Sequence, residues 1–121
     1  MEAVEVGKKL VELCNKGQHL KAVDTLYSDD IVSVEAEEMP GMPLEMKGIE
    51  AIRQKNVAWD KENETDKFEA QGPFAHGDSF AVHFKMSGKS KTTGKPFSGE
   101  EVGIYTVKDG KIVREEFFYT M

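Results

Sequence analysis

The chain has 121 residues, a size typical of one domain, so we expect residues 1–121 to fold around a single core. Hydrophobic residues make up 39% of the sequence and charged residues 31%, a balance that argues against a disordered chain. The formal net charge of -6 opposes binding to nucleic acid and to anionic membrane surfaces.

Cys14 is the single cysteine, so no disulfide can form within one chain. This usage is typical of a reducing compartment, and we expect a cytoplasmic location. No stretch of the sequence approaches the roughly 20 apolar residues that a membrane span needs, so we expect no membrane association.

The first half of the chain has helical periodicity. We predict a helix over residues 3–16 that ends at Gly17, a short second helix that ends at residues 28–30, and a third helix after Gly48. Residues 31–35 are predicted as a short strand between the second and third helices. The three helical stripes are Val6, Leu10, Leu13 and Cys14; Leu20, Val23, Leu26 and Tyr27; and Ile49, Ile52, Asn56 and Trp59.

The second half alternates between apolar and polar residues, which is typical of strands. We predict strands over residues 64–74, 80–86, 97–107 and 112–119, with Asp109 and Gly110 in a tight hairpin turn. Helices followed by antiparallel strands predict an α+β domain with the helices on one face of a curved sheet.

The predicted sheet has apolar residues on both faces. Val102 and Ile104 lie opposite to Tyr105, and Phe118 lies opposite to Phe117. Because an apolar face exposed to water is unfavourable, we predict a homodimer that packs through its sheets.

Three phrases in order carry a family resemblance: "LCNKGQHLKAVDTLYSDDIVSVEA", "KGIEAIRQ" and "GIYTVKDGKIVREEFFY". Together they resemble the SnoaL-like branch of the superfamily that includes nuclear transport factor two, ketosteroid isomerase and scytalone dehydratase. The resemblance implies a cone in which three N-terminal helices pack over the concave face of a curved antiparallel sheet and enclose an apolar pocket. Members include isomerases, dehydratases, polyketide cyclases, epoxide hydrolases and non-catalytic modules, so the fold alone assigns no reaction.

Comparison with ketosteroid isomerase implies a role for Glu35, which falls at the position of that enzyme's general base. A carboxylate that faces an apolar pocket loses hydration, and this raises its pKa and its strength as a base. The two oxyanion donors of the isomerase fall on Leu10 and Gly103, which can supply no such hydrogen bond. Steroid isomerisation is therefore not expected.

The same comparison with ketosteroid isomerase implies which side chains of each strand face the pocket. Glu35, Asn56 and Tyr105 are the candidate catalytic residues, with Glu101 and Glu115 as further acids that could shift one another's pKa. The candidate ligand-binding residues are Val82, Phe84, Met86, Glu101, Glu115, Phe117 and Tyr119. A register error of one residue would reverse these assignments, and the tyrosines could be ordinary core aromatics.

The segment of residues 34–48 combines apolar side chains with carboxylates. Met39 and Met42 are predicted to border the mouth of the pocket, because methionine adapts to varied apolar ligands. They could instead cap the core. No metal-binding motif is present, and we expect neither a metal nor a cofactor.

Two functions remain open from the sequence. The first is a cofactor-independent isomerase, cyclase or dehydratase that acts on a small apolar carbonyl compound through Glu35, assisted by Asn56 and Tyr105. The second is a non-catalytic ligand-binding or dimeric scaffold domain, in which Glu35 orients a ligand or pairs with an amine.

Overall fold

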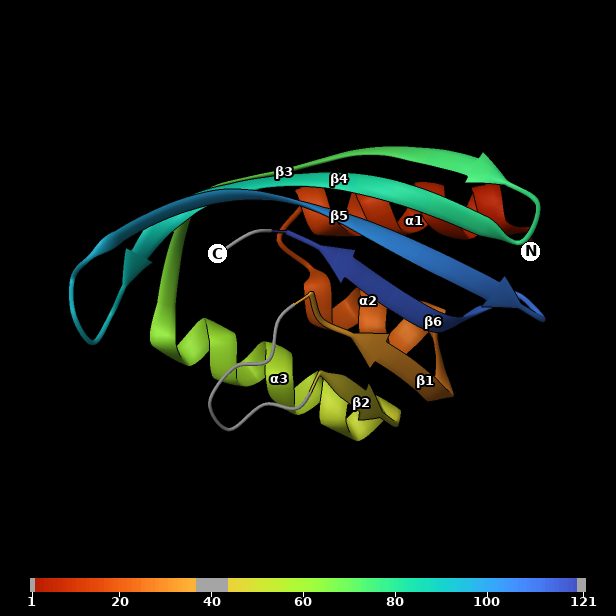
Figure 1. The fold of residues 1–121 in the computed structure, drawn as a ribbon, viewed down its shortest axis with the longest axis horizontal. Coiled ribbons are helices and arrows are strands. Elements are labelled where there is room, and N and C mark those ends of the chain that lie inside the picture. The colour runs from red at the N-terminus through yellow and green to blue at the C-terminus, as the bar shows by residue number, and fades with distance from the viewer. Residues whose placement is uncertain (1, 37–43, 120–121) are drawn as a thin grey trace.

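A computed structural model describes residues 2–36 and 44–119. These described residues form three helices and six strands (Figure 1). In chain order they are α1 (Ala3–Asn15), α2 (His19–Leu26), β1 (Tyr27–Val34), β2 (Glu45–Lys47), α3 (Ile49–Glu62), β3 (Asn63–His76), β4 (Ser79–Ser90), β5 (Pro96–Lys108) and β6 (Lys111–Phe118).

The strands form a single curved sheet in the order β2-β1-β6-β5-β4-β3. Strands β3 to β6 make an antiparallel meander, whereas β1 pairs in parallel with β6. The α+β fold is confirmed, but the sheet is mixed rather than wholly antiparallel as expected. The reason is that the last strand inserts beside the first, and the two then run in the same direction.

Curvature comes from the three long strands β3, β4 and β5, which arch over the molecule in Figure 1. The pairing of β3 with β4 shifts register between Thr65 and Lys67 and again between Gln71 and Phe74. Such bulges bend a strand and increase its twist. The bent sheet leaves room for the helices along one side.

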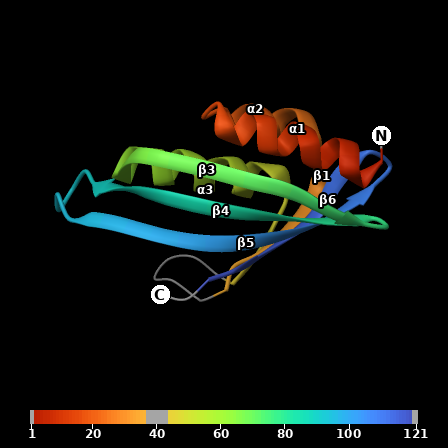
Figure 2. The ribbon, with the colours of Figure 1, turned by 90° about the horizontal axis from the view of Figure 1, so that it is seen from above.

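The helices cover the sheet in two groups. Helices α1 and α2 lie together on one side of the sheet in Figure 2, where α1 packs against β3 and β4. Helix α3 contacts α2, both short strands β1 and β2, and the start of β3. None of the described helices has the length and apolar content required to cross a membrane.

The predicted stripe of α1 is confirmed, because Val6, Leu10 and Cys14 are all buried in the core. Burial raises the pKa of the Cys14 thiol to about 12, which suits a structural role. The end of the second helix was predicted wrongly. Tyr27 opens β1, and residues 28–30 continue that strand between two stretches that pair with β6, at Tyr27 and from Val32 onward, so pairing on both sides overrides the local turn preference.

The predicted hairpin turn between β5 and β6 is confirmed. Asp109 and Gly110 have φ angles of 52° and 77°, in the left-handed region that a type I′ turn requires. This turn brings β6 back along β5, where Tyr105 pairs with Glu115 and Gly103 with Phe117.

Candidate functional site

Polar side chains from β1, α3 and the end of β6 meet on the helix-covered face of the sheet. They form a continuous chain of hydrogen bonds and ion pairs, which we call the carboxylate cluster. Its members are Tyr27, Ser33, Glu35, Lys55, Glu115 and Tyr119.

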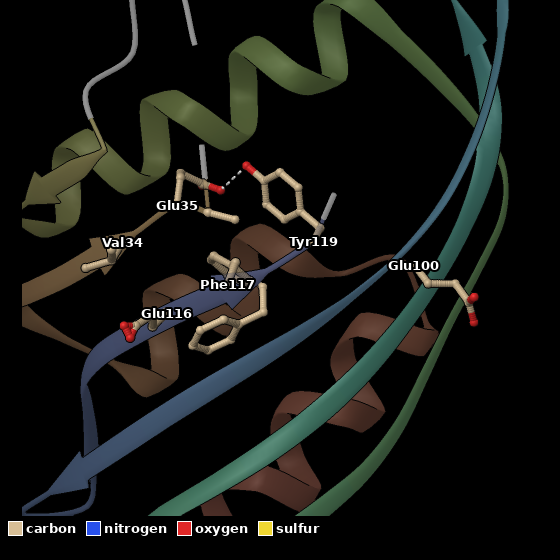
Figure 3. Close-up of a pocket in the computed structure, with 8 residues that line it drawn as sticks. Val34, Glu35, Glu100, Glu116, Phe117 and Tyr119 are labelled. Carbon is tan, nitrogen blue, oxygen red and sulfur yellow. Dashed lines mark hydrogen bonds between the residues drawn. The ribbon is translucent and has the colours of Figure 1, made fainter. Parts of the chain in front are cut away.

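Glu35 follows directly on β1, and its backbone N–H donates to the Leu44 carbonyl oxygen at 2.8 Å. Its Oε1 lies 2.8 Å from the Lys55 ammonium, and its Oε2 accepts a hydrogen bond of 2.9 Å from the Tyr119 hydroxyl (Figure 3). The side chain is 13% exposed. The structure therefore places Glu35 at the expected strand end, as an ion-paired carboxylate.

Lys55, Ser33 and Tyr27 are members of the cluster that the sequence analysis did not propose as site residues, and Lys55 is the charged one among them. It lies on α3, and its Nζ donates to Glu35 and, at 3.2 Å, to Ser33 Oγ. The ammonium also lies 5.3 Å from the centre of the Phe117 ring, close enough for a cation–π contact. A lysine three residues after the buried Ile52 is on the sheet-facing side of its helix, and that spacing was the available signal.

Glu115 is 2% exposed and accepts hydrogen bonds from Tyr27 and, at 2.9 Å, from Ser33. Burial raises the pKa of this carboxyl, and the nearby Lys55 charge and the two hydrogen bonds oppose the shift. Ser33 and Glu115 are direct partners in the parallel pairing of β1 with β6. Glu115 is therefore part of the buried cluster and does not line the pocket described below.

Glu101 lies on β5, on the same face as Gly103 and Tyr105. Burial raises the pKa of its carboxyl to about 7, and the Glu35 charge adds to this shift while Lys55 opposes it. Within the described residues, the carboxyl makes no hydrogen bond or ion pair. A partly buried acid with a pKa near neutrality can both accept and donate a proton.

Tyr105 is 2% exposed, stacked on Phe80 with ring centres 4.9 Å apart and set edge-on to Phe117. Burial and the Glu115 charge raise the pKa of the phenol, so its hydroxyl remains a donor. No hydrogen bond to another described residue uses this hydroxyl. It reaches along β5 over Gly103, where an added Cβ would lie 3.0 Å from the hydroxyl oxygen.

The remaining predicted residues lie in three places. Val82 and Phe84 are buried, and Met86 is partly buried against the same core. Asn56 uses its amide N–H to bond the Ile52 carbonyl oxygen of its own helix at 3.0 Å. Met39 and Met42 lie outside the described residues.

An open pocket of about 650 Å³ lies where β1 and β6 end (Figure 3). This volume is within the usual range for small-molecule sites. Three predicted residues, Glu35, Phe117 and Tyr119, contribute to its lining. The full lining is Val34, Glu35, Ala36, Glu100, Glu116, Phe117, Phe118 and Tyr119. Across the described ranges, no group of three or more metal-ligating side chains is placed to hold an ion.

Comparison with solved structures defines the class of fold. An NTF2-like protein from Burkholderia thailandensis superposes with a TM-score of 0.81 at 20% identity, covering 99% of this chain and 92% of that one. A protein with a ketosteroid isomerase-like fold from Catenulispora acidiphila, in complex with trimethylamine, gives 0.75 at 18% identity, covering 97% and 86%. At these identities the likeness establishes the NTF2-like α+β fold alone.

The particular family follows from two stronger matches. The family model of the SnoaL-like domain matches residues 1–119, so the chain belongs to the SnoaL-like family. A Mesorhizobium loti protein, described as a candidate SnoaL-like polyketide cyclase and also labelled a carbohydrate phosphatase, is 39% identical. The alignment covers 98% of this chain and 100% of that one, with a TM-score of 0.91. No curated protein sequence matches the chain.

Proposed function

We propose that this SnoaL-like protein is a cofactor-independent enzyme that moves a proton on a small apolar carbonyl compound, as isomerases, cyclases and dehydratases do. The observation that carries this proposal is the Glu101 carboxyl. It is partly buried, has a pKa of about 7 and makes no hydrogen bond to a described residue. A group with these properties at neutral pH is suited to general acid–base catalysis.

Glu101 is the proton acceptor in this proposal. It removes the proton next to the substrate carbonyl, and the electron pair of that C–H bond becomes a C=C bond as the carbonyl oxygen becomes negative. The protonated Glu101 then returns the proton to another atom of the substrate. No co-reactant is consumed in this exchange, which agrees with the expectation that no cofactor is needed.

Lys55 and Tyr105 supply the donors for the negative oxygen. An ammonium has three N–H groups, and in the described residues Lys55 uses two of them, on Glu35 and Ser33. The Tyr105 hydroxyl is a second available donor. A donor aimed at a developing oxyanion contributes roughly 3 kcal/mol to lowering the barrier. These groups would replace the pair of donors that the comparison with ketosteroid isomerase found missing.

Glu35 has a different role in this proposal from the general base expected at its position. Its carboxylate already accepts one bond from Lys55 and another from Tyr119. Both oxygens of this carboxylate are already engaged by neighbouring donors, one of them cationic. Glu35 therefore orients Lys55, and Glu101 takes the proton.

Hydrogen–deuterium exchange of an enolisable ketone tests the proposed function. We use 2-tetralone in D₂O at neutral pH and follow loss of its α-proton signals by NMR. The wild-type protein should exceed the buffer rate, and Glu101→Gln should lower the catalysed rate by about 10²-fold or more. Glu64→Gln on β3, whose side chain is 55% exposed and lies outside the pocket lining, is the control and should retain the rate. A catalysed rate unaffected by Glu101→Gln would contradict the assignment of the base.

A non-catalytic binding domain is the second candidate, and the Glu35–Lys55 ion pair favours it because that pair satisfies both charges without a reaction. In that case 2-tetralone would shift NMR signals of the pocket residues Phe117 and Tyr119 but would exchange its protons at the buffer rate.

A further inference from the structure

We propose that Glu115 is a positioning residue, which fixes the Lys55 ammonium in the orientation that the substrate oxyanion requires. This inference rests on the proposed function, because Lys55 has that task only in the proposed reaction. The sequence analysis expected Glu115 to contact a ligand. In this proposal Glu115 acts instead through its neighbours Ser33 and Lys55.

Burial excludes direct contact between Glu115 and a ligand in this structure. The residue is 2% exposed, Oε2 accepts from Tyr27, and Oε1 accepts from Ser33. Such a buried carboxyl costs free energy, and an apolar residue of similar size would often be at least as stabilising. Packing alone is therefore a weak explanation for a carboxyl at this position.

The direction of the hydrogen bonds links Glu115 to Lys55. Ser33 is fully buried and carries one hydroxyl proton, which it donates to Glu115 Oε1 at 2.9 Å. Its oxygen lone pairs are then free to accept from Lys55 Nζ at 3.2 Å. Glu115 thus sets the Ser33 hydroxyl as an acceptor toward the ammonium.

The charge interaction between Glu115 and Lys55 also favours this position of the ammonium. Lys55 Nζ lies 3.9 Å from Glu115 Oε1, beyond hydrogen-bond distance but within ion-pair distance. A lysine side chain has many rotamers, so holding it in one of them requires several simultaneous contacts. Glu115, Ser33 and Glu35 provide such contacts from two neighbouring strands.

Tyr27 anchors the far side of the carboxyl. It opens β1, is 8% exposed and donates its hydroxyl proton to Glu115 across 88 residues of sequence. The order of the contacts is therefore Tyr27 to Glu115, Glu115 to Ser33, and Ser33 to Lys55. Lys55, the proposed donor to the substrate, is the last member of this shielded series and uses two of its three N–H groups within the described residues.

NMR of the Lys55 ammonium tests this role without depending on catalysis. Side-chain ammonium protons exchange slowly with water when they are held by acceptors. We expect Glu115→Gln and Ser33→Ala each to raise the exchange rate of the Lys55 ammonium protons about 10-fold. Ser33→Ala removes the bridge and keeps the Glu115 charge, so it remains informative if Glu115→Gln does not fold. Glu12→Gln on α1, whose side chain is 61% exposed and lies outside the pocket lining and the carboxylate cluster, is the control and should leave the rate unchanged.

The Glu101 titration separates positioning from general destabilisation. Burial is the main cause of the raised pKa of Glu101, and the Glu115 charge adds a smaller increase, so Glu115→Gln should lower that pKa slightly, whereas Ser33→Ala should leave it unchanged. Lys55 exchange rates equal to the wild-type rate in both variants would overturn the proposal. If wild-type protein fails to exchange 2-tetralone protons while Lys55 responds as expected, the reaction is wrong and the positioning of Lys55 by Glu115 stands.

Discussion

The Lys55 ammonium lies 2.8 Å from Glu35 Oε1, and the two side chains are only 15% and 13% exposed. Both members of this pair are shielded from water, whereas the Lys16–Glu12 and Lys47–Glu45 pairs are largely exposed, and a shielded pair is coupled more strongly than a surface one. This contact joins α3 to the end of β1. We therefore expect it to contribute to stability and, in the proposed reaction, to the placement of the Lys55 donor.

Removal of the cation should destabilise the protein. Lys55→Met leaves Glu35 and Glu115 without their positive partner, and we expect a loss of about 3 kcal/mol in the free energy of unfolding. Urea denaturation at pH 7 measures it. Lys47→Met is the control, because its side chain is 75% exposed and 3.9 Å from Glu45, and its effect should stay within about 0.5 kcal/mol. Equal losses in both variants would show that the burial of the Lys55 pair is unimportant.

The raised pKa of Glu101 makes stability depend on pH in a defined direction. A carboxyl whose pKa rises from 4.5 to about 7 on folding binds more protons in the folded state, so its contribution falls as pH increases through that window. Glu101→Gln should therefore leave stability at pH 4 unchanged and increase it at pH 8. We expect a gain of about 2 kcal/mol, after allowance for the partial exposure of the side chain.

Urea unfolding of the wild-type protein and of Glu101→Gln across pH 4 to 8 measures this dependence, with Glu100→Gln as the exposed control. The carboxyl of Glu115, whose pKa is also raised by burial, adds a dependence of the same sign in all three proteins. A Glu101→Gln variant with no gain at pH 8 would mean that the Glu101 carboxyl is well solvated.

Two glycines of β5 offer a matched test of the packing around Tyr105. A Cβ on Gly103 would lie 2.9 Å from the Tyr105 ring and 3.2 Å from the Phe117 ring, so Gly103→Ala should displace both and cost about 1–3 kcal/mol. Gly99→Ala meets no atom within 4 Å on the same strand and should be neutral or slightly stabilising. Thermal unfolding compares them. A Gly103→Ala variant as stable as Gly99→Ala would show that Tyr105 can move at little cost.

We expect the homodimer to form through the outer face of the sheet. Phe118 on β6, Ile104 on β5 and Phe74 on β3 are 53%, 37% and 65% exposed. Exposed large apolar side chains on a sheet favour association. In analytical ultracentrifugation, the 13.5 kDa chain should sediment as a dimer, and Phe118→Glu should sediment as a monomer.

The control for this experiment is Val57→Glu on α3, because Val57 is 38% exposed but lies away from the sheet. It should leave the dimer intact. A wild-type chain that sediments as a monomer at micromolar concentration would refute the expected homodimer.

The sequence alone determined the elements whose causes are local. Helical spacing of Val6, Leu10 and Cys14 predicted α1, and alternation predicted the long strands, because side-chain periodicity follows directly from backbone geometry. The Asp109–Gly110 turn was also predictable, since it needs only residues that accept positive φ angles. The strand predicted over residues 31–35 placed Glu35 at a strand end, and the family resemblance gave the same position independently.

Tertiary structure decided the composition of the site. The parallel insertion of β6 beside β1 makes Ser33 and Glu115 neighbours although 82 residues separate them, and no periodicity encodes that pairing. The packing of α3 then brings Lys55, rather than Asn56, onto the carboxylates. The raised pKa of Glu101 depends on desolvation and on charges from other elements, so the shift arises only when the chain folds.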